Sequence, residues 1–420
     1  MKKILLLGGS RFLVPVIREA KALGCHTITC DYLPDNIAHR YSDEYHNVSI
    51  IDREAVLALA RTLQVDGVMS FACDPGVVTA AYVAEKMGLP APGPLESVEI
   101  LQDKGRFRAF LKKNGFRVPE ARSYDKRETA LREAVEPCED SSWADVWPKI
   151  VKPVDSAGSK GVTRVDSPAE LDAAIDHALA FSRSGSFLIE DFIQQQGFSS
   201  DTDCFSVDGE LCFASFDNQY FDRRAENPYA PDGYTWPSVM PEETQKELRD
   251  ELQRLLHLLN MRTGVYNVET RQGTDGNAYL MEVSPRGGGN RLSEMLEYCS
   301  GTALVRNAVR AAIGLPVDSM QDPVYRGHWS IVILHAPRSG FFSGLRLAEN
   351  VETSLVERDL WVTEGDPVEG FTGANKAVGT LVMNWPSEEE RDRRMADVSA
   401  WAEVLVSEVP CGKKDGADED

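Results

Sequence analysis

A predicted hairpin near residue 270 brings two glutamates face to face. Apolar runs at residues 265–269 and 278–283 flank a polar turn at 273–277. Asp275-Gly276 is a strong signal for a two-residue hairpin turn, and a turn centred there places Glu269 directly opposite Glu282. Like charges directly opposite destabilise a sheet, so the pattern predicts a compensating cation, of which Mg²⁺ with oxygen ligands is the simplest. Two solvated glutamates on an exposed face are the alternative.

The segment that follows Glu282 favours a binding site over that alternative. It reads Ser284-Pro285-Arg286-Gly287-Gly288-Gly289-Asn290-Arg291. An arginine beside bare glycine backbone suits an anionic ligand, because both offer N–H donors without bulky side chains between them.

Charge and hydropathy exclude several classes of function. The 420 residues can form two or three cores, and the net charge of −21 argues against non-specific binding to nucleic acid or an acidic membrane surface. No apolar stretch is long enough to span a bilayer, and the apolar start at 4–7 is too short for a secretion signal. The eight cysteines are scattered and indicate neither a zinc site nor a disulfide framework. These features predict a cytoplasmic protein without nucleic-acid or membrane partners.

The first part of the chain alternates short apolar strands with amphipathic helices, which is typical of a doubly wound parallel sheet. The expected strands are Lys3–Leu7, His26–Asp31, Val48–Ile51 and Gly67–Phe71, and the expected helices are Phe12–Leu23, Arg53–Leu63 and Val77–Met87. The turn after the first strand lacks the GxGxxG spacing of dinucleotide-binding folds. A nicotinamide-dependent oxidoreductase is therefore disfavoured.

A Gly/Ser-rich loop at 155–162 follows a strand that carries Lys152. Its small residues, hydroxyls and mobile N–H groups can fold over phosphates, although it lacks the order of a Walker P-loop. A flexible hairpin loop is the alternative for this segment. The strand at 187–193 mixes apolar and acidic residues and could offer backbone hydrogen bonds to an adenine, or could be a core strand with a solvated acidic end.

Later segments contain further strands, helices and a basic loop. We expect a hairpin around Asp208-Gly209, a loop at 221–229 with two arginines, and an acidic disordered tail at 412–420. Continuous helices are expected at 97–114, 241–260, 292–314 and 387–408, and short strands at 327–334, 351–357, 360–362 and 377–384.

In their order and spacing, these motifs resemble the ATP-grasp superfamily, and within it the carboxylate-amine ligases related to L-amino acid ligases, biotin carboxylase and the carbamoyl phosphate synthetase large subunit. The resemblance spans about residues 1–385 and is carried by Gln102-Asp103-Lys104, Ile150–Pro153, the 155–162 loop, Glu190–Ile193, Glu269 and Glu282–Arg286.

The resemblance implies an α/β and α+β fold in which a doubly wound parallel-sheet domain precedes an ATP-grasp fold. The expected parts are an N-terminal domain at 1–94, a small ATP-grasp subdomain or lid at 95–190, a large subdomain with the metal site at 191–325, a β-rich subdomain with a terminal helix at 326–411, and the tail at 412–420.

The resemblance also implies roles for individual residues. Lys104 and Lys152 match the lysines that hold the α- and β-phosphates of ATP, Arg286 matches the arginine that steadies the transferred phosphoryl group, and Lys152 and Arg286 are the expected catalytic residues. Glu269 and Glu282 match ligands of Mg²⁺, expected as two ions that Mn²⁺ can replace. The remaining nucleotide contacts are implied for Ser156, Gly158, Ser159 and Gly161 of the lid and for Glu190, Asp191, Phe192 and Ile193 of the linker, where backbone groups of Asp191 and Ile193 would read adenine.

The resemblance also implies residues that contact the substrate. They are Gly287, Gly288, Asn290 and Arg291, with Arg223 and Arg224 as candidate anchors for a carboxylate. Surface arginines are more often simply solvated, which is the alternative for the last two.

Two positions depart from the family pattern. Ser284 stands where the family commonly has a metal-binding asparagine, so one Mg²⁺ would be held less directly, through water or by Asn290. The ribose-binding acid of a G-x-E motif is replaced at Gly197-Phe198-Ser199, and Asp201 is the candidate substitute.

The implied function is ATP-dependent amide or peptide bond formation through an acyl phosphate, with release of ADP and phosphate. The substrates would be a small carboxylate, such as an amino acid, and an amine, and the protein would form a homodimer. A thiol or hydroxyl acceptor, or a non-catalytic nucleotide-binding protein, are the alternatives.

Overall fold

The computed structural model describes residues 1–135, 143, 146–156 and 158–409, and these divide into two compact units. The first unit comprises Met1–Ala157, Gly161–Phe216 and Met240–Val324, and the second comprises Gly158–Lys160, Asp217–Val239 and Tyr325–Asp420. The predicted disordered tail lies outside the described residues. Within the described part of the chain, no helix has the length and apolar character needed to cross a membrane.

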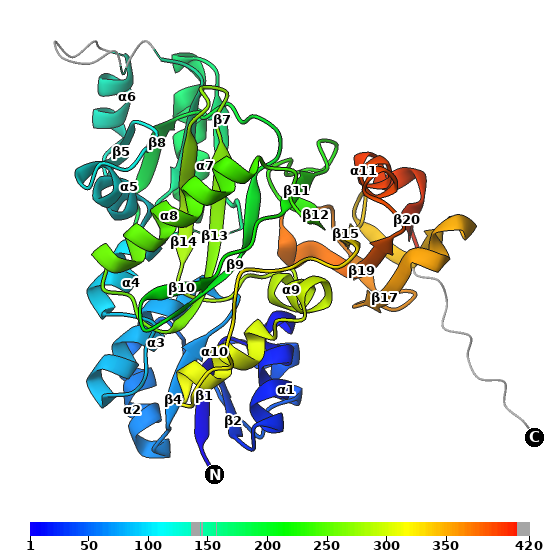
Figure 1. Cartoon of the computed structure of the whole chain (residues 1–420). Coiled ribbons are helices and arrows are strands. Elements are labelled where there is room, and N and C mark those ends of the chain that lie inside the picture. Colours follow the sequence, from blue (N-terminus) through cyan, green and yellow to red (C-terminus); the bar gives the residue numbers. More distant parts are fainter. Residues whose placement is uncertain (136–142, 144–145, 157, 410–420) are drawn as a thin grey trace, which may run out of the picture. The chain divides into compact units, whose positions relative to one another are not determined.

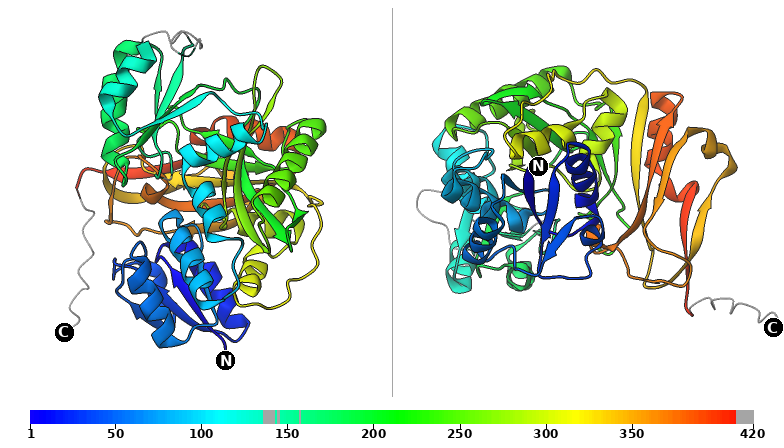
Figure 2. Two further views of the ribbon diagram at one scale, coloured as in Figure 1. Left: turned by 90° about the vertical axis from the view of Figure 1, so that its left-hand side faces the viewer. Right: turned by 90° about the horizontal axis from the view of Figure 1, so that it is seen from below.

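The first unit begins with the predicted parallel sheet. Its strands run in the order β3-β2-β1-β4, with β1 at Lys3–Leu7, β2 at His26–Cys30, β3 at Glu44–His46 and β4 at Gly67–Ser70. Helix α1 (Val14–Ala22) lies on one face, and α2 (Arg53–Leu63) and α3 (Asp74–Met87) lie on the other (Figure 1 and Figure 2). Coverage on both faces explains why β1 is a continuous run of apolar residues.

One strand of this sheet differs from the sequence prediction. Residues 48–51 are not a strand, and β3 lies earlier, at Glu44–His46. The Asp52 N–H donates to Ser49 O at 3.0 Å and closes a turn there, while the Asp52 side chain accepts from the Ala55 N–H and caps α2. A capped helix start therefore occupies the place predicted for the strand.

A small antiparallel sheet forms the next part of the first unit. Its order is β5-β8-β6-β7, with β5 at Ala121–Tyr124, β8 at Phe187–Asp191, β6 at Lys149–Pro153 and β7 at Thr163–Val165. Helices α6 (Arg127–Val135) and α7 (Leu171–Phe181) accompany it.

The expected helix at 97–114 is two helices, α4 (Leu95–Gln102) and α5 (Lys104–Lys113). Asp103 is extended between them, and its side chain accepts from the Arg106 N–H as the N-cap of α5. The break makes Lys104 the first residue of a helix, which fixes where its side chain starts.

A second antiparallel sheet carries the predicted hairpin. It runs β10-β9-β13-β14, with β10 at Glu210–Phe213, β9 at Ser200–Val207, β13 at Gly264–Gln272 and β14 at Ala278–Ser284. Helix α8 (Glu242–Leu258) lies along one face, as Figure 1 shows. Its buried leucines pack in the core beneath it. The expected helix at 292–314 is split into α9 (Leu292–Ser300) and α10 (Leu304–Ala312) by Gly301, whose φ is +81°.

In the described residues of the second unit, two antiparallel sheets are accompanied by one α-helix and short 3₁₀ turns. The larger sheet has the order β11-β12-β15-β19-β17, with strands at Asn218–Phe221, Pro231–Trp236, His328–His335, Ala377–Trp385 and Leu355–Leu360. The smaller sheet has the order β18-β16-β20, with strands at Pro367–Val368, Gly340–Leu347 and Ala402–Ser407. The fold class predicted from the sequence is confirmed.

The end of the second unit corrects two further predictions. Helix α11 covers Glu388–Ala396 only, and the rest of the expected 387–408 helix is strand β20. Ala402 and Val404 are buried while Glu403 between them is exposed, which is the alternation of a strand. The two short strands expected at 351–357 and 360–362 are instead the single strand β17, preceded by a 3₁₀ turn at Glu349–Ser354.

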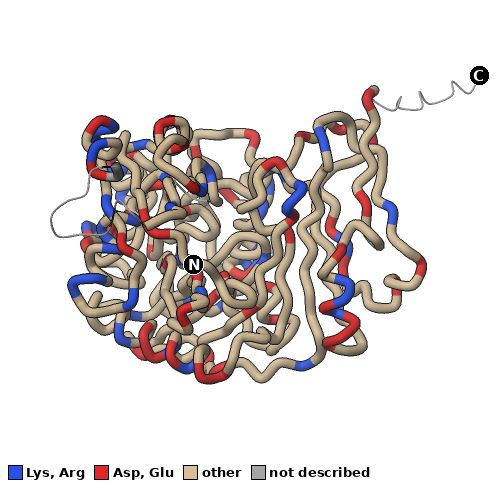
Figure 3. The backbone as a smooth tube through the Cα atoms, turned by 90° about the horizontal axis from the view of Figure 1, so that it is seen from above, with Lys and Arg blue, Asp and Glu red and all other residues tan. Residues whose placement is uncertain are grey.

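Charged residues of both signs are interspersed along the backbone, as Figure 3 shows. Any site for an anion must therefore be built from a few placed basic side chains within an acidic protein.

Candidate functional site

The predicted pairing of the two glutamates is confirmed. Glu269 on β13 lies opposite Glu282 on β14. The route to this register differs from the prediction, because the pairs nearest the turn are centred on Asp275 and a bulge between Glu269 and Thr270 leaves Met281 without a partner. The bulge shifts the register by one residue and restores the pairing expected from a turn centred between Asp275 and Gly276.

Two rows of polar residues cross the strands β9, β13 and β14 at this level. One row is Asp201–Glu269–Glu282, and the next is Asp203–Asn267–Ser284. Residues two apart on a strand share a face, so the two rows form one polar face. Asp203 and Asn267 were missed from the sequence, although both lie two residues from a predicted site residue.

Each glutamate of the hairpin contacts a basic side chain. Lys104 Nζ lies 3.0 Å from Glu282 Oε2, and Arg271 Nη2 lies 3.4 Å from Glu269 Oε1. Protein cations thus supply positive charge beside the two glutamates, whereas the sequence pattern predicted that Mg²⁺ would supply it. Within the described ranges, no group of three or more His, Cys, Asp and Glu side chains is arranged to hold a metal ion.

The acidic row nevertheless has unbalanced negative charge. Burial and the neighbouring charge of Glu269 raise the pKa of Asp201 to about 7. Burial raises the pKa of Asp203 to about 6, even though its carboxylate accepts from the Gly288 N–H at 2.8 Å and from Ser293 Oγ. A divalent cation at the glutamate pair would offset this excess with the oxygen ligands that Mg²⁺ prefers, so the residues present fit such an ion.

Arg286 is held rigidly at the edge of the polar face. Its Nε and Nη2 donate to the two oxygens of Asp74 at 2.9 and 2.8 Å, and Nη1 donates to Asn267 Oδ1 at 2.9 Å. Ser284 Oγ donates to the same Asp74 carboxylate at 3.0 Å and accepts from Gln102 Nε2 at 2.7 Å. Although burial opposes it, Arg286 lowers the pKa of Asp74, so the pair stays ionised.

The first two of the three glycines after Arg286 are required by close approach. A Cβ on Gly287 would lie 2.2 Å from the Phe71 ring, and one on Gly288 would lie 2.8 Å from Asn267 Nδ2 and 2.9 Å from Asp203 Oδ1. Asn290 and Arg291 follow with φ of +52° and +65°. Arg291 also forms an ion pair with Glu294 at 3.2 Å. This segment thus joins the polar face to the loop after β4.

Lys152 lies in a closed ionic centre. Its Nζ bonds to Glu190 Oε1, and Arg108 Nε lies 2.8 Å from Glu190 Oε2. Although burial opposes it, the charges of Arg108 and Lys152 hold the pKa of Glu190 at about 2, while burial lowers the pKa of Lys152. Sequence reasoning missed Arg108, which lies one helical turn after Lys104 and therefore on the same face of α5.

Several predicted nucleotide contacts are placed differently by the structure. In the predicted lid, Ala157 is outside the described residues and Gly158–Lys160 groups with the second unit. The substrate candidates Arg223 and Arg224 also belong to the second unit. The Asp191 N–H donates to Glu120 O at 2.9 Å and the Phe192 N–H to Pro148 O at 3.1 Å. Of the linker N–H groups predicted to read adenine, that of Asp191 is committed to this backbone bond.

The two remaining candidate sites also have defined surroundings. Asp201, the expected ribose ligand, accepts from Asn267 Nδ2 at 2.8 Å and pairs with Glu269 across the sheet. Asp201 therefore belongs to the row Asp201–Glu269–Glu282, which suits a contact with a cation better than a contact with a sugar. Arg224 is exposed and bonded to Asp222 at 3.1 Å, which matches the alternative of a solvated arginine.

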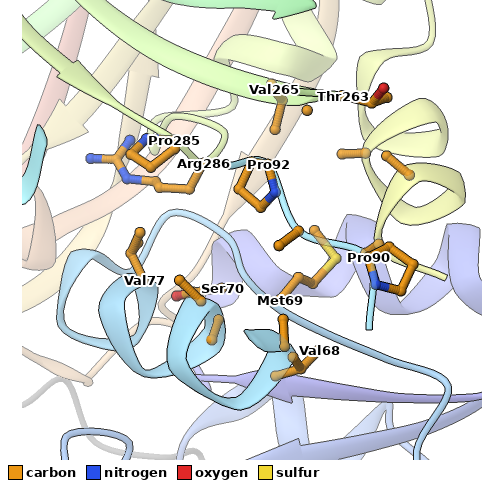
Figure 4. A pocket seen from close by; sticks show the side chains of 18 residues that line it. Val68, Met69, Ser70, Val77, Pro90, Pro92, Thr263, Val265, Pro285 and Arg286 are labelled. Carbon is orange, nitrogen blue, oxygen red and sulfur yellow. The ribbon is translucent and has the colours of Figure 1, made fainter. Parts of the chain in front are cut away.

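Two cavities adjoin Arg286 and Asp74. The first, of ≈60 Å³, is lined chiefly by small apolar side chains from α3, α10 and the 90–92 linker. In Figure 4 the guanidinium of Arg286 points away from Pro92 and Val265, so only the stem of this side chain lines the apolar cavity. The second, of ≈330 Å³, is polar and includes Asp74, Gln102 and three arginines.

Comparison with known proteins relates this site to one domain family. Residues 146–294 match the model of the ATP-grasp domain. A formate-dependent phosphoribosylglycinamide formyltransferase of Synechococcus sp. (strain WH7803) is 30% identical over 205 residues, which cover 46% of this chain and 48% of that protein. The match therefore spans about half the length of such curated relatives.

Solved structures extend the likeness to nearly the whole chain. The L-amino acid ligase from Bacillus licheniformis superposes with a TM-score of 0.77 at 20% identity, covering 97% of this chain and 99% of that one. The biotin carboxylase domain dimer of 2-oxoglutarate carboxylase from Hydrogenobacter thermophilus, in complex with MgADP, gives 0.72 at 17% identity, covering 96% and 91%. At these identities the likeness shows the fold.

Proposed function

Because this chain is a protein of the ATP-grasp superfamily, we propose that it is an ATP-dependent ligase that joins a small carboxylate to an amine and releases ADP and phosphate. The observation that carries the proposal is the convergence, within the first unit, of Lys104, the Glu269–Glu282 pair and the held arginine Arg286. These are the positive and metal-binding groups that phosphoryl transfer needs, because its catalysis is chiefly positioning and charge neutralisation.

The proposed reaction has two steps. An oxygen of the substrate carboxylate attacks the γ-phosphorus of ATP, and the bond from that phosphorus to the bridging β-phosphate oxygen breaks. The products of this step are ADP and an acyl phosphate. The amine then attacks the acyl carbon, inorganic phosphate leaves, and the amine proton is lost. Neither step needs a Ser, Cys or His nucleophile.

This chain's residues have distinct roles in that scheme. Lys104 would exchange Glu282 for the phosphates of ATP, since its present acidic partner is a partly exposed carboxylate. Arg286, fixed by Asp74 and Asn267, would stabilise charge on the transferred group without reorganising. Glu269 and Glu282 would hold Mg²⁺, which supplies further neutralisation of phosphate charge when bound. Lys152, Ser156, Gly158, Ser159 and Gly161 keep their proposed phosphate contacts, and Ile193 keeps the adenine contact.

The substrate class is proposed from one line of support. The likeness to an L-amino acid ligase over nearly the whole chain favours an amino acid or a similar small carboxylate. A homodimer is proposed by analogy with the dimer of the biotin carboxylase domain.

The test is release of ADP and phosphate from Mg-ATP in the presence of paired carboxylates and amines. We expect turnover that needs both partners and is lost in Glu282→Ala. The mass of the product would distinguish an amide from a thioester or ester. Turnover that persists in Glu282→Ala, or binding of ATP without turnover on any pair, would contradict the proposed ligase.

A further inference from the structure

The polar cavity beside Asp74 carries an inference about what the substrate looks like. Its lining comes from the start of α2, the start of α3, the α4–α5 junction and the base of the 155–162 loop, all in the first unit. Its volume of ≈330 Å³ falls within the range of small-molecule sites. Asp74 is shared with the site already described, because the same carboxylate holds Arg286.

Three arginines and four carboxylates line this cavity, and the arginines have more N–H donors than their present contacts use. Arg53 Nη1 and Arg106 Nη1 bind the two oxygens of one carboxylate, Glu99, at 3.0 and 3.4 Å. Arg183 donates through Nη2 to a neutral acceptor, the Asp155 backbone carbonyl. Each guanidinium has five N–H donors, so the three offer far more hydrogen bonds than these contacts consume.

The other carboxylates of the cavity are already directed at protein partners. Asp74 receives both arms of Arg286. Asp103 accepts from the Arg106 N–H, and Asp155 accepts from the N–H groups of Arg183 and Ser184. The acids of the lining are therefore fixed toward the backbone and toward Arg286, while the arginine side chains keep unused donors.

The arginines have protein partners before any ligand arrives, although the side chains of Arg53 and Arg106 are 43% and 45% exposed. Glu99 holds Arg53 and Arg106 together, and the Arg53 guanidinium lies 6.0 Å from the centre of the Tyr82 ring. Guanidinium groups recognise planar or tetrahedral oxyanions through paired donors, and preorganisation reduces the entropy lost on binding.

We propose that this cavity binds an anionic group of the co-substrate, a carboxylate or a phosphate ester remote from the reacting atoms. The identity of the ligand as a co-substrate rests on the proposed ligase function, whereas the anion site itself does not. The cavity meets the proposed catalytic region at Asp74. A molecule whose anionic group is bound by the arginines would therefore extend its opposite end toward Arg286. The co-substrate is therefore an acid of at least two polar ends.

The test measures binding of two probes by isothermal titration at constant ionic strength: inorganic phosphate and succinate. We expect at least one to bind the wild type and to bind about tenfold to hundredfold more weakly in the Arg53→Gln/Arg106→Gln double variant, as expected for charged hydrogen bonds. Whichever probe binds tells a phosphate ester from a carboxylate.

Two comparisons keep this test separate from the proposed function. Arg117→Gln removes a comparable exposed arginine, paired with Glu247, and should leave probe binding unchanged. Lys104→Met removes a proposed ATP lysine and should also leave probe binding unchanged, even where turnover is lost. Binding that is equal in the double variant and the wild type, that is lost in Lys104→Met, or that is absent for both probes would overturn the proposal.

Discussion

Two carboxylates of the first unit each contact a lysine, yet their surroundings are opposite. Glu190 is 3% exposed, and its two oxygens are occupied by Lys152 and Arg108. Glu282 is 30% exposed, and one of its oxygens contacts Lys104. The first centre is closed by the protein, whereas the second can exchange its partner. A lysine beside an acid is therefore enclosed by the protein in one place and partly open to solvent in the other.

The pKa values follow the same division. In the closed centre the basic side chains hold the pKa of Glu190 at about 2, despite its burial. In the open row the acids outnumber the cations, and burial together with Glu269 raises the pKa of Asp201 to about 7. The closed centre has two cations around one acid, whereas the open row has more acids than cations, an excess that a bound cation would offset.

The largest expected effect comes from the open side. We expect Arg286→Ala to lower ATP turnover roughly 10³- to 10⁵-fold, the range that an arginine in phosphoryl transfer contributes. The measurement is phosphate release with the best substrate pair. Asp74→Asn serves as the control, because it leaves the guanidinium but loosens it, and its loss should be smaller. Near wild-type turnover in Arg286→Ala would remove this residue from the site.

The next effect tests the closed side. Glu190→Ala leaves Arg108 and Lys152 buried without their partner, so we expect the free energy of unfolding to fall by about 3–5 kcal/mol. Glu282→Ala, the matched change on the open side, should cost less than about 1 kcal/mol, because its pair is partly exposed. Urea denaturation measures both. Equal losses in the two variants would erase the distinction between the centres.

A pH titration sharpens the comparison. The folded state keeps a proton on Asp201 up to about pH 7, whereas an unfolded aspartate releases it near pH 4. Unfolding therefore releases a proton in this window, and the free energy of unfolding should fall as pH rises from about 4 to 7, by at most about 1.4 kcal/mol per pH unit. Asp203, whose pKa is raised to about 6, adds to this slope, so Asp201→Asn should reduce the slope without removing it. A slope unchanged in the variant would contradict the raised pKa.

Glu190 should act in the opposite sense at lower pH. Its pKa of about 2 lies below that of an unfolded glutamate, so its contribution is present above about pH 4 and is lost as pH falls toward 2. The two slopes can be separated in one series of denaturation curves.

The smallest effect concerns Arg271. Its contact with Glu269 is 3.4 Å long and partly exposed. We expect Arg271→Gln to change the free energy of unfolding by less than about 1 kcal/mol. The measurement is urea denaturation in low and high salt, since a surface contact should weaken with salt. A loss of several kcal/mol would place Glu269 in a closed centre like that of Glu190.

The sequence predicts those parts of the molecule that depend on local spacing. A turn centred between Asp275 and Gly276 was enough to predict Glu269 opposite Glu282, although the structure reaches that pairing through a bulge, and the apolar runs were enough for most of the parallel sheet. Helix breaks were missed at Asp103 and Gly301, where one cap or one left-handed residue interrupts an otherwise helical pattern. Such breaks depend on a single residue, and a periodic pattern averages over them.

Contacts between segments distant in the sequence could not be predicted from the spacing of residues along the chain. The bond from Arg286 to Asp74 joins residues 212 positions apart, and the bond from Arg108 to Glu190 joins residues 82 apart. Nothing local to either arginine shows which acid it will meet. The resemblance supplied a role for Arg286, but only the fold shows that Asp74 and Asn267 hold it in place.

The bulge at Met281 has a consequence for how the hairpin tolerates change. Arg108 donates through Nη1 to the Met281 carbonyl at 2.7 Å and through Nε to Glu190, so it ties the strand that carries Glu282 to the closed centre. The tie uses the main chain and makes no demand on the side chain at 281. Replacing Met281 should cost packing energy, because its side chain is buried, but should leave the tie in place, whereas deleting the residue should cut the tie. In this hairpin the number of residues carries information that their identities do not.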